Sequence, residues 1–227
     1  MSNYEQTLWK LMGVLFKPHP WHGVSPGDEV PQTLRCFVEV VPSDTVKYEI
    51  DKITGYLKVD RPQKYSSICP ALYGFVPQTL CADRVAELSS QRIGQRLEGD
   101  GDPLDICILT DRPIHHGNLL VDCHPIGGFR MVDDNEADDK IIAVLKNDAV
   151  YGAMSEIDQV ASPILDRLRH YFLTYKQSPD SASSTCQVTH VYGREEAHEV
   201  ILRSLADYEE RFGRIEEILN AALGTVQ

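Results

Sequence analysis

The stretch Glu98–Ile106, with the sequence EGDGDPLDI, places Asp100, Asp102 and Asp105 within six residues. A glycine and a proline between them bend and stiffen the chain. Carboxylates held this close raise each other's pKa, and a divalent cation among them removes that penalty. The alternative is a solvated acidic turn at the start of a strand, and the motif alone does not distinguish the two.

The kind of cation follows from the ligand chemistry. The stretch is not an EF-hand loop, which needs Gly at its sixth position and Glu at its twelfth. Counted from Asp100, those positions hold Asp105 and Asp111. Hard oxygen donors favour Mg²⁺, Mn²⁺ or Ca²⁺ over zinc, which prefers sulfur or imidazole.

Short apolar runs around this stretch predict a small β-barrel. Many short strands separated by Gly/Pro turns, with few helices between them, favour a barrel over alternating β-α-β units. Residues 82–99 are polar and uneven, and we interpret them as an inserted loop with room for a helical turn. Strands are expected at 36–41, 105–110, 119–124, 128–132 and 140–145, with a β-hairpin formed by 47–51 and 56–60.

Two helices are expected after the barrel. The first has Ser162 as its N-cap and Pro163 at its first helical position. The second occupies the C-terminal region 194–227, and its apolar residues recur every three or four positions. That stripe is more typical of core packing or a subunit contact than of a cofactor site. Residues 177–189 are interpreted as a Ser-rich linker.

Composition limits the class of protein. The chain has 227 residues, which suits a single domain, and its net charge of −12 disfavours nucleic-acid binding. It has no run near the ~18 apolar residues of a membrane span. Residues 4–16 are expected to form an amphipathic helix rather than a signal peptide. The six cysteines form no Cys-x-x-Cys pair and are expected to be reduced thiols of a cytoplasmic protein.

A second acidic stretch, MVDDNEADDK at 131–140, also leads into an apolar strand. Glu39 adds a carboxylate within the apolar run CFVEVV. Two acidic turns that feed strands of one barrel predict several cations held between them. Taken singly, each basic residue is typical of a surface, but together they could line an anion pocket: Lys47, Arg61, Lys140 and Lys176.

With these segments in place, the chain resembles the family I soluble inorganic pyrophosphatases. The DGDPLD element, with the other segments at these distances, is highly specific. The resemblance implies one pyrophosphatase domain over 1–227, mainly β with flanking α, built as a five-stranded OB-like barrel plus two C-terminal helices. The matching segments keep the family order: FVEV (37–40), KYEIDKITGYLKVDRP (47–62), YGFVPQTL (73–80), GDGDPLDI (99–106), PIGGFRMVD (125–133), EADDKIIAV (136–144) and HYFLTYK (170–176).

The resemblance implies Mg²⁺-dependent hydrolysis of pyrophosphate to two orthophosphates by a metal-activated water, with Mn²⁺ or Zn²⁺ as substitutes. Asp102 would be the general base, and Glu49 would support the groups that touch the substrate. The implied metal ligands are Asp100, Asp105, Asp138, Asp133 and Glu39. The implied substrate-binding residues are Lys47, Arg61, Tyr73, Lys140, Tyr175 and Lys176.

Some features depart from the family pattern. Cys69 stands where many bacterial members have a tyrosine, and the tryptophan often found after the Tyr-Lys helix is absent from 177–189. The compact length favours the bacterial type and a homo-hexamer over a dimer. Two alternatives remain: a hydrolase of another phosphoanhydride, such as a nucleotide, and a non-catalytic OB-type binding module. The second should show a basic groove with aromatic residues, which this acidic chain does not suggest.

Overall fold

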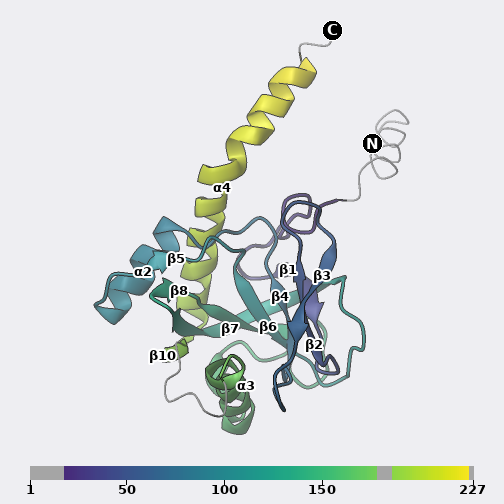
Figure 1. Cartoon of the computed structure of the whole chain (residues 1–227), viewed down its shortest axis with the longest axis vertical. Helices are drawn as coiled ribbons and strands as arrows, with labels where there is room; N and C mark the ends of the chain where they lie inside the picture. Colours follow the sequence, from purple (N-terminus) through teal and green to yellow (C-terminus); the bar gives the residue numbers. More distant parts are fainter. Residues whose placement is uncertain (1–17, 178–185, 225–227) are drawn as a thin grey trace.

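Five strands form a closed ring in the computed structural model, which describes residues 18–177 and 186–224, with side chains to residue 213. The β6–β9 pair is parallel and the other four pairs are antiparallel. The predicted mainly-β fold with an OB-like barrel is therefore confirmed, although its strands differ widely in length (Figure 1). In ring order the strands are β1 (Leu34–Val40), β4 (Leu72–Phe75), β6 (Asp105–Leu109), β9 (Lys140–Leu145) and β7 (Leu119–Asp133), which pairs back with β1.

Strand β7 joins two segments that were predicted as separate strands, 119–124 and 128–132. Its register against β9 shifts between Pro125 and Gly127, so the strand bends there and continues instead of ending. Beyond the bend it pairs with β10 (Cys186–Gly193) and with the short β8 (Glu136–Ala137), which in turn pairs with β5 (Glu98–Gly99). The linker predicted at 177–189 is thus wrong from Cys186 onward, where β10 begins.

The predicted hairpin is present as a separate two-stranded sheet beside the barrel (Figure 1). It consists of β2 (Val46–Ile50) and β3 (Leu57–Pro62). Gly55 closes the turn with φ +72°, a left-handed conformation that glycine adopts without steric cost. The sheet carries Lys47 and, through its turn, Lys52 towards the mouth of the barrel.

The inserted segment is a helix and not a loop. Helix α2 (Asp83–Ile93) buries Val85, Ala86 and Leu88 and ends at Gly94, which has φ +76°. Only a few of its residues face the protein, so the apolar stripe is too narrow to stand out in the sequence. Most of this segment is therefore a regular helix that packs against α4, where the sequence predicted an irregular loop.

The two C-terminal helices are present. A short 3₁₀ helix, η1 (Ile157–Gln159), precedes α3 (Ser162–Thr174), whose N-cap is Ala161 and not the predicted Ser162. Helix α4 (Arg194–Gly224) runs past the barrel, and its C-terminal part projects away from it (Figure 1). None of the described helices has a length and apolar character sufficient to span a bilayer. The helix predicted at 4–16 lies outside the described residues.

The barrel strands are buried on both faces, which explains their continuous apolar sequences. On β9, Ile141 and Ala143 pack in a cluster that includes Ala197, Val200 and Ile201 of α4. Their neighbours Ile142 and Val144 pack in a second cluster with Leu168 and Phe172 of α3. All six cysteines are buried within these layers, in agreement with the predicted core positions.

Candidate active site

One cavity of about 210 Å³ brings together every predicted site residue except Arg61. Its walls come from β1, the β2–β3 hairpin, β4, the acidic loop before β6, the ends of β7 and β9, and the end of α3. Segments far apart in sequence therefore converge, as the barrel topology requires. The predicted residues in the lining are Glu39, Lys47, Glu49, Tyr73, Asp100, Asp102, Asp105, Asp133, Asp138, Lys140, Tyr175 and Lys176.

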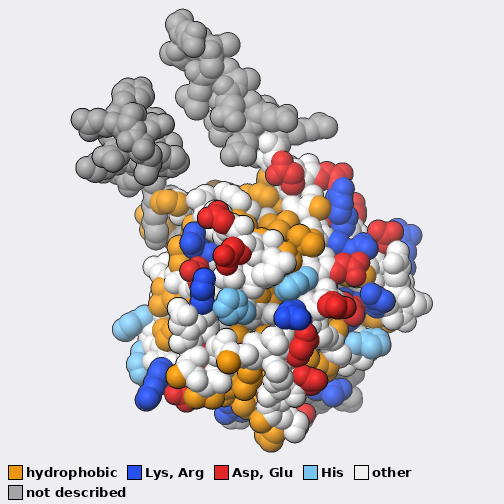
Figure 2. Space-filling view, turned by 180° about the vertical axis from the view of Figure 1, so that it is seen from behind, with side chains coloured by type: hydrophobic (Ala, Val, Ile, Leu, Met, Phe, Trp, Pro, Cys, Tyr) orange, Lys and Arg blue, Asp and Glu red, His pale blue; other side chains and the backbone are white. Residues whose placement is uncertain are grey.

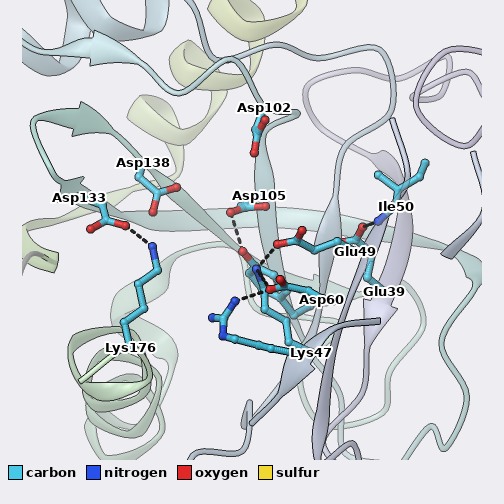
Figure 3. A network of polar contacts seen from close by, with 12 residues as sticks. Glu39, Lys47, Glu49, Ile50, Asp60, Asp102, Asp105, Asp133, Asp138 and Lys176 are labelled. Carbon is cyan, nitrogen blue, oxygen red and sulfur yellow. Dashed lines mark hydrogen bonds and ion pairs between the residues drawn. The ribbon is translucent and has the colours of Figure 1, made fainter. Parts of the chain in front are cut away.

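The acidic loop is shaped by its own backbone. Gly101 has φ +73°, and the Asp102 N–H donates a hydrogen bond to Asp100 Oδ1 at 2.8 Å. Asp105 opens β6 and lies opposite Lys140 in the parallel β6–β9 pair. The Tyr73 hydroxyl on β4 donates to Asp105 Oδ2 at 2.5 Å. The spacing of the motif thus places Asp105 in the sheet and both Asp100 and Asp102 in the loop before it. Figure 3 shows the positions of Asp102 and Asp105.

Lysine ammonium groups lie between the carboxylates. Lys140 is 2% exposed and pairs with both Asp105 and Asp138, and Lys176, just after α3, pairs with Asp133 (Figure 3). Burial opposes the charged form of Lys140, but the two aspartates outweigh it and raise its pKa. Asp105 and Asp138 therefore stabilise the positively charged form of Lys140 in the pocket.

Two carboxyl groups of the site carry an electrostatic cost. Glu39 is 6% exposed and accepts a hydrogen bond from the Ile50 N–H at 2.6 Å, yet burial raises its pKa to about 8. Burial also raises the pKa of Asp100 to about 8, and repulsion from Asp138 adds to the effect. A cation placed beside these two carboxyl groups would stabilise their ionised forms and lower their pKa values.

The hairpin supplies cations at the other side of the pocket. Lys47 pairs with Glu49, and its Nζ lies 3.5 Å from an oxygen of Asp60, which also pairs with Arg61 (Figure 3). The structure does not place Arg61 in the lining. Its guanidinium carbon lies 5.8 Å from the ring centre of Tyr175, and its buried Nη2 has no hydrogen-bond partner among the residues that the structure describes. That nitrogen remains available to an acceptor at the edge of the pocket.

Two charged residues of the lining were not predicted from the sequence. Lys52, in the turn of the hairpin, pairs with Asp102, and Glu136 contributes from the second acidic stretch. The signal for Lys52 was the hairpin itself, because its turn has to project from the sheet. Glu136 stands among several acidic residues, and nothing in the sequence distinguishes it from its neighbours.

The donor set fits hard divalent cations. The lining carries carboxylates and no histidine or cysteine, which is the ligand chemistry of Mg²⁺ rather than of a structural zinc site. Within the described residues, no three acidic, His or Cys side chains are grouped closely enough to hold a metal in this arrangement. Lysines occupy the space between them, so cation binding has to displace ammonium groups from the carboxylates.

The face of the molecule turned away from the view of Figure 1 carries mixed charges. On the face that Figure 2 shows, Lys and Arg side chains are scattered among Asp and Glu and form no basic groove. His115 and His116 are exposed. His22 is partly exposed and stacks on Trp21 with ring centres 4.5 Å apart. Carboxylates for hard cations beside lysines for an anion are the groups of an enzyme that acts on a metal–phosphate substrate.

Comparison with known proteins identifies the family. The family model described as "Inorganic pyrophosphatase" matches residues 36–209. An inorganic pyrophosphatase of Chlamydia muridarum is 49% identical over 195 residues, covering 84% of this chain and 93% of that protein. Soluble inorganic pyrophosphatase 2 of Chlamydomonas reinhardtii is 36% identical, covering 86% and 90%. The solved inorganic pyrophosphatase of Thermus thermophilus superposes with a TM-score of 0.70 at 27% identity, covering 85% and 99%.

The chain belongs to the inorganic pyrophosphatase family. This membership confirms the predicted family and the predicted enzyme class, a hydrolase of a phosphoanhydride. Enzymes of this family need a divalent metal, in agreement with the oxygen-donor chemistry of the pocket.

Proposed function

We propose that this chain hydrolyses inorganic pyrophosphate to two orthophosphates with Mg²⁺, and that the reaction takes place in the pocket at the mouth of the barrel. The observation that carries the proposal is the convergence of carboxylates and lysines from several separate elements on one cavity. Pyrophosphate is small and highly anionic, so catalysis of its cleavage depends mainly on positioning and charge neutralisation.

The carboxylates would hold the cations. Asp100, Asp105 and Asp138 are the proposed ligands of the tightest ion, and Asp133 and Glu39 would hold ions nearer the substrate. Bound Mg²⁺ supplies charge neutralisation and lowers the pKa of a coordinated water from its bulk value towards ~7. Carboxylate oxygens also bind Mn²⁺ well, so Mn²⁺ could substitute for Mg²⁺. Zn²⁺ could also bind but matches an all-carboxylate site less well.

The basic residues would hold the phosphate groups. Lys140 and Lys176 are tied to carboxylates in this structure. Once those carboxylates bind cations, the ammonium groups become free to face phosphate oxygens. Lys47, Tyr73 and Tyr175 line the same cavity, and the unpartnered Nη2 of Arg61 offers a further donor at its edge. Glu49 would hold Lys47 in place.

Asp102 is the proposed general base. It stands apart from the carboxylates that pair with Lys140, its side chain is half exposed, and it lines the cavity where water can enter (Figure 3). A carboxylate that is not consumed by tight cation binding can take the proton of the attacking water. Lys52 pairs with Asp102 and would help to orient its side chain.

We also propose that the chain is cytoplasmic and forms a homo-oligomer, a hexamer rather than a dimer. The likeness to a bacterial structure over 99% of that chain supports the bacterial type. Light scattering coupled to gel filtration would measure the number of 25.5 kDa subunits directly.

A phosphate-release assay tests the activity. The purified chain is incubated with pyrophosphate or with ATP, each with and without Mg²⁺. We expect fast release from pyrophosphate with Mg²⁺ and little from ATP, because most residues of the lining are charged and suit a small anion better than an uncharged base. Equal rates on ATP would favour a broader phosphoanhydride hydrolase, and no release from pyrophosphate would refute the proposal.

A further inference from the structure

A buried carboxylate of helix α4 caps a different helix. Asp207 is 3% exposed and accepts hydrogen bonds from the backbone N–H groups of Ala82, Arg84 and Val85 at 3.1 to 3.2 Å. These are the free N–H groups at the start of α2, whose own N-cap, Ala82, offers no side chain for them. The start of α2 therefore depends on a residue more than a hundred positions later in the chain.

The residue before this cap touches the acidic loop directly. The Cys81 N–H donates to the Asp102 carbonyl at 2.8 Å, and the Gly101 N–H donates to the Cys81 carbonyl at 3.0 Å. The contact is close, because a Cβ placed on Gly99 would lie 2.5 Å from the Cys81 carbonyl oxygen and 2.6 Å from the Ala82 Cα. The backbone at 81–82 and the loop that carries the carboxylates can therefore move only together.

A second bond from α4 acts on the same segment. The Leu80 N–H donates to the Ser204 carbonyl at 2.9 Å. Helix α4 thus holds residues 80–85 from both ends, through Ser204 before the contact with the loop and through Asp207 after it. Helix α4 lies beside α2 (Figure 1) and packs against both α2 and the barrel strand β7.

From these contacts we infer that Asp207 is a positioning residue for the metal-binding loop. By capping α2 it fixes the Cys81 backbone, which in turn fixes the peptide groups at Gly101 and Asp102 and so the directions of Asp100 and Asp102. The inference rests on the proposed function, because it assigns those two carboxylates to cations and catalysis. Helix α4 would therefore affect the site through Asp207, although none of its described residues lines the cavity.

The test compares Asp207→Ala with a matched control, Glu210→Ala. Glu210 is one turn further along α4, is exposed, and pairs with the side chain of Arg84. Binding of Mn²⁺ is measured by calorimetry, and amide exchange is measured at Cys81 and Gly101. For Asp207→Ala we expect Mn²⁺ affinity to fall about tenfold, the effect of losing an outer support of a metal site, with faster exchange at both amides. Glu210→Ala should stay within twofold of the wild type.

Kinetics separate positioning from general loss of stability. In Asp207→Ala the Mg²⁺ concentration for half-maximal rate should rise, and kcat at saturating Mg²⁺ should approach the wild-type value. If this variant lowers only the melting temperature and leaves Mn²⁺ affinity and the two amides unchanged, Asp207 is merely a helix cap and the inference is wrong.

A second variant covers failure to fold. Asp207→Asn keeps the volume, but its amide nitrogen has to face a backbone N–H, so exchange at Cys81 and Gly101 should still accelerate. Wild-type exchange and Mn²⁺ affinity in a folded Asp207→Asn would also overturn the inference. If the wild type binds Mn²⁺ but releases no phosphate from pyrophosphate, the proposed function fails while the Mn²⁺ comparison still decides the role of Asp207.

Discussion

A buried ion pair behind the active site yields a quantitative prediction of stability. The side chains of Arg130 and Asp139 are 1% and 0% exposed. Arg130 Nε lies 3.2 Å from both oxygens of Asp139, and Nη2 lies 2.9 Å from Oδ2. The Tyr192 hydroxyl donates to the same carboxylate at 3.1 Å, and Arg130 Nη1 lies 2.9 Å from Glu196 Oε1. Together with Tyr192 and Glu196, the pair connects β7, the residue before β9, β10 and α4.

The substitution Arg130→Met keeps the volume and removes every guanidinium bond to Asp139. The Asp139 carboxylate then stays buried, and the Tyr192 hydroxyl is the main side chain that still donates a hydrogen bond to it. Removal of one partner of a buried ion pair costs about 3–5 kcal/mol, because the remaining charge is left uncompensated. At about 2–4 °C per kcal/mol for a chain of this size, the melting temperature should fall by about 6–20 °C.

Guanidinium unfolding followed by circular dichroism measures this loss. The control is Arg92→Met, which removes an exposed contact between Arg92 Nε and Glu196 at 3.2 Å and should cost less than about 1 kcal/mol. The double variant Arg130→Met/Asp139→Leu replaces both charges by apolar groups and should regain most of the stability. A cost for Arg130→Met no larger than that of the control, at an unchanged m value, would refute the reasoning.

Three further predictions concern the site and the thiols. Asp102→Asn should keep the fold and lower kcat by at least ~10², the scale of a lost general base; near-normal turnover would show that Asp102 has another role. Ca²⁺ should compete with Mg²⁺ and inhibit phosphate release, because its larger and looser coordination shell positions water less well; full activity in Ca²⁺ alone would contradict this. In the native state a thiol reagent should label almost none of the six cysteines, all buried, and should label all six in guanidinium; rapid native labelling would show that one thiol is accessible.

Most of the barrel was predictable because its strands carry strong local signals. Strands β1, β6 and β9 are apolar runs bounded by acidic or turn residues, and each was placed within two residues at its start. Strand β4 was missed because it is four residues long and contains a glycine. Strand β10 was missed because the Ser-rich segment before it dominates the local composition. Helix α2 was missed because α4 supplies both its cap and its packing surface.

The site was predictable to the extent that its residues belong to motifs. The spacing of the acidic residues in the DGDPLD loop and in the second acidic stretch indicated which carboxylates belong to the site. The barrel brings these carboxylates together in one cavity. Lys52 and Glu136 belong to no such pattern, and their places depend on how a turn and a two-residue strand are folded. The pairing of Lys140 with both Asp105 and Asp138 depends on the parallel β6–β9 register, which sequence alone does not give.

The length of β7 has a consequence for how the chain is made. One end of this strand pairs with β1, so that Leu34 faces Cys123, and the other end pairs with β10, so that Asp133 faces Cys186. During synthesis the ribosome releases β1 early, and β4 can pair with one of its edges, but the other edge waits for β7, almost ninety residues later. Its unpaired edge is then a place where two nascent chains can associate wrongly. Chaperone dependence at high expression should therefore be set by the time between release of β1 and release of β7.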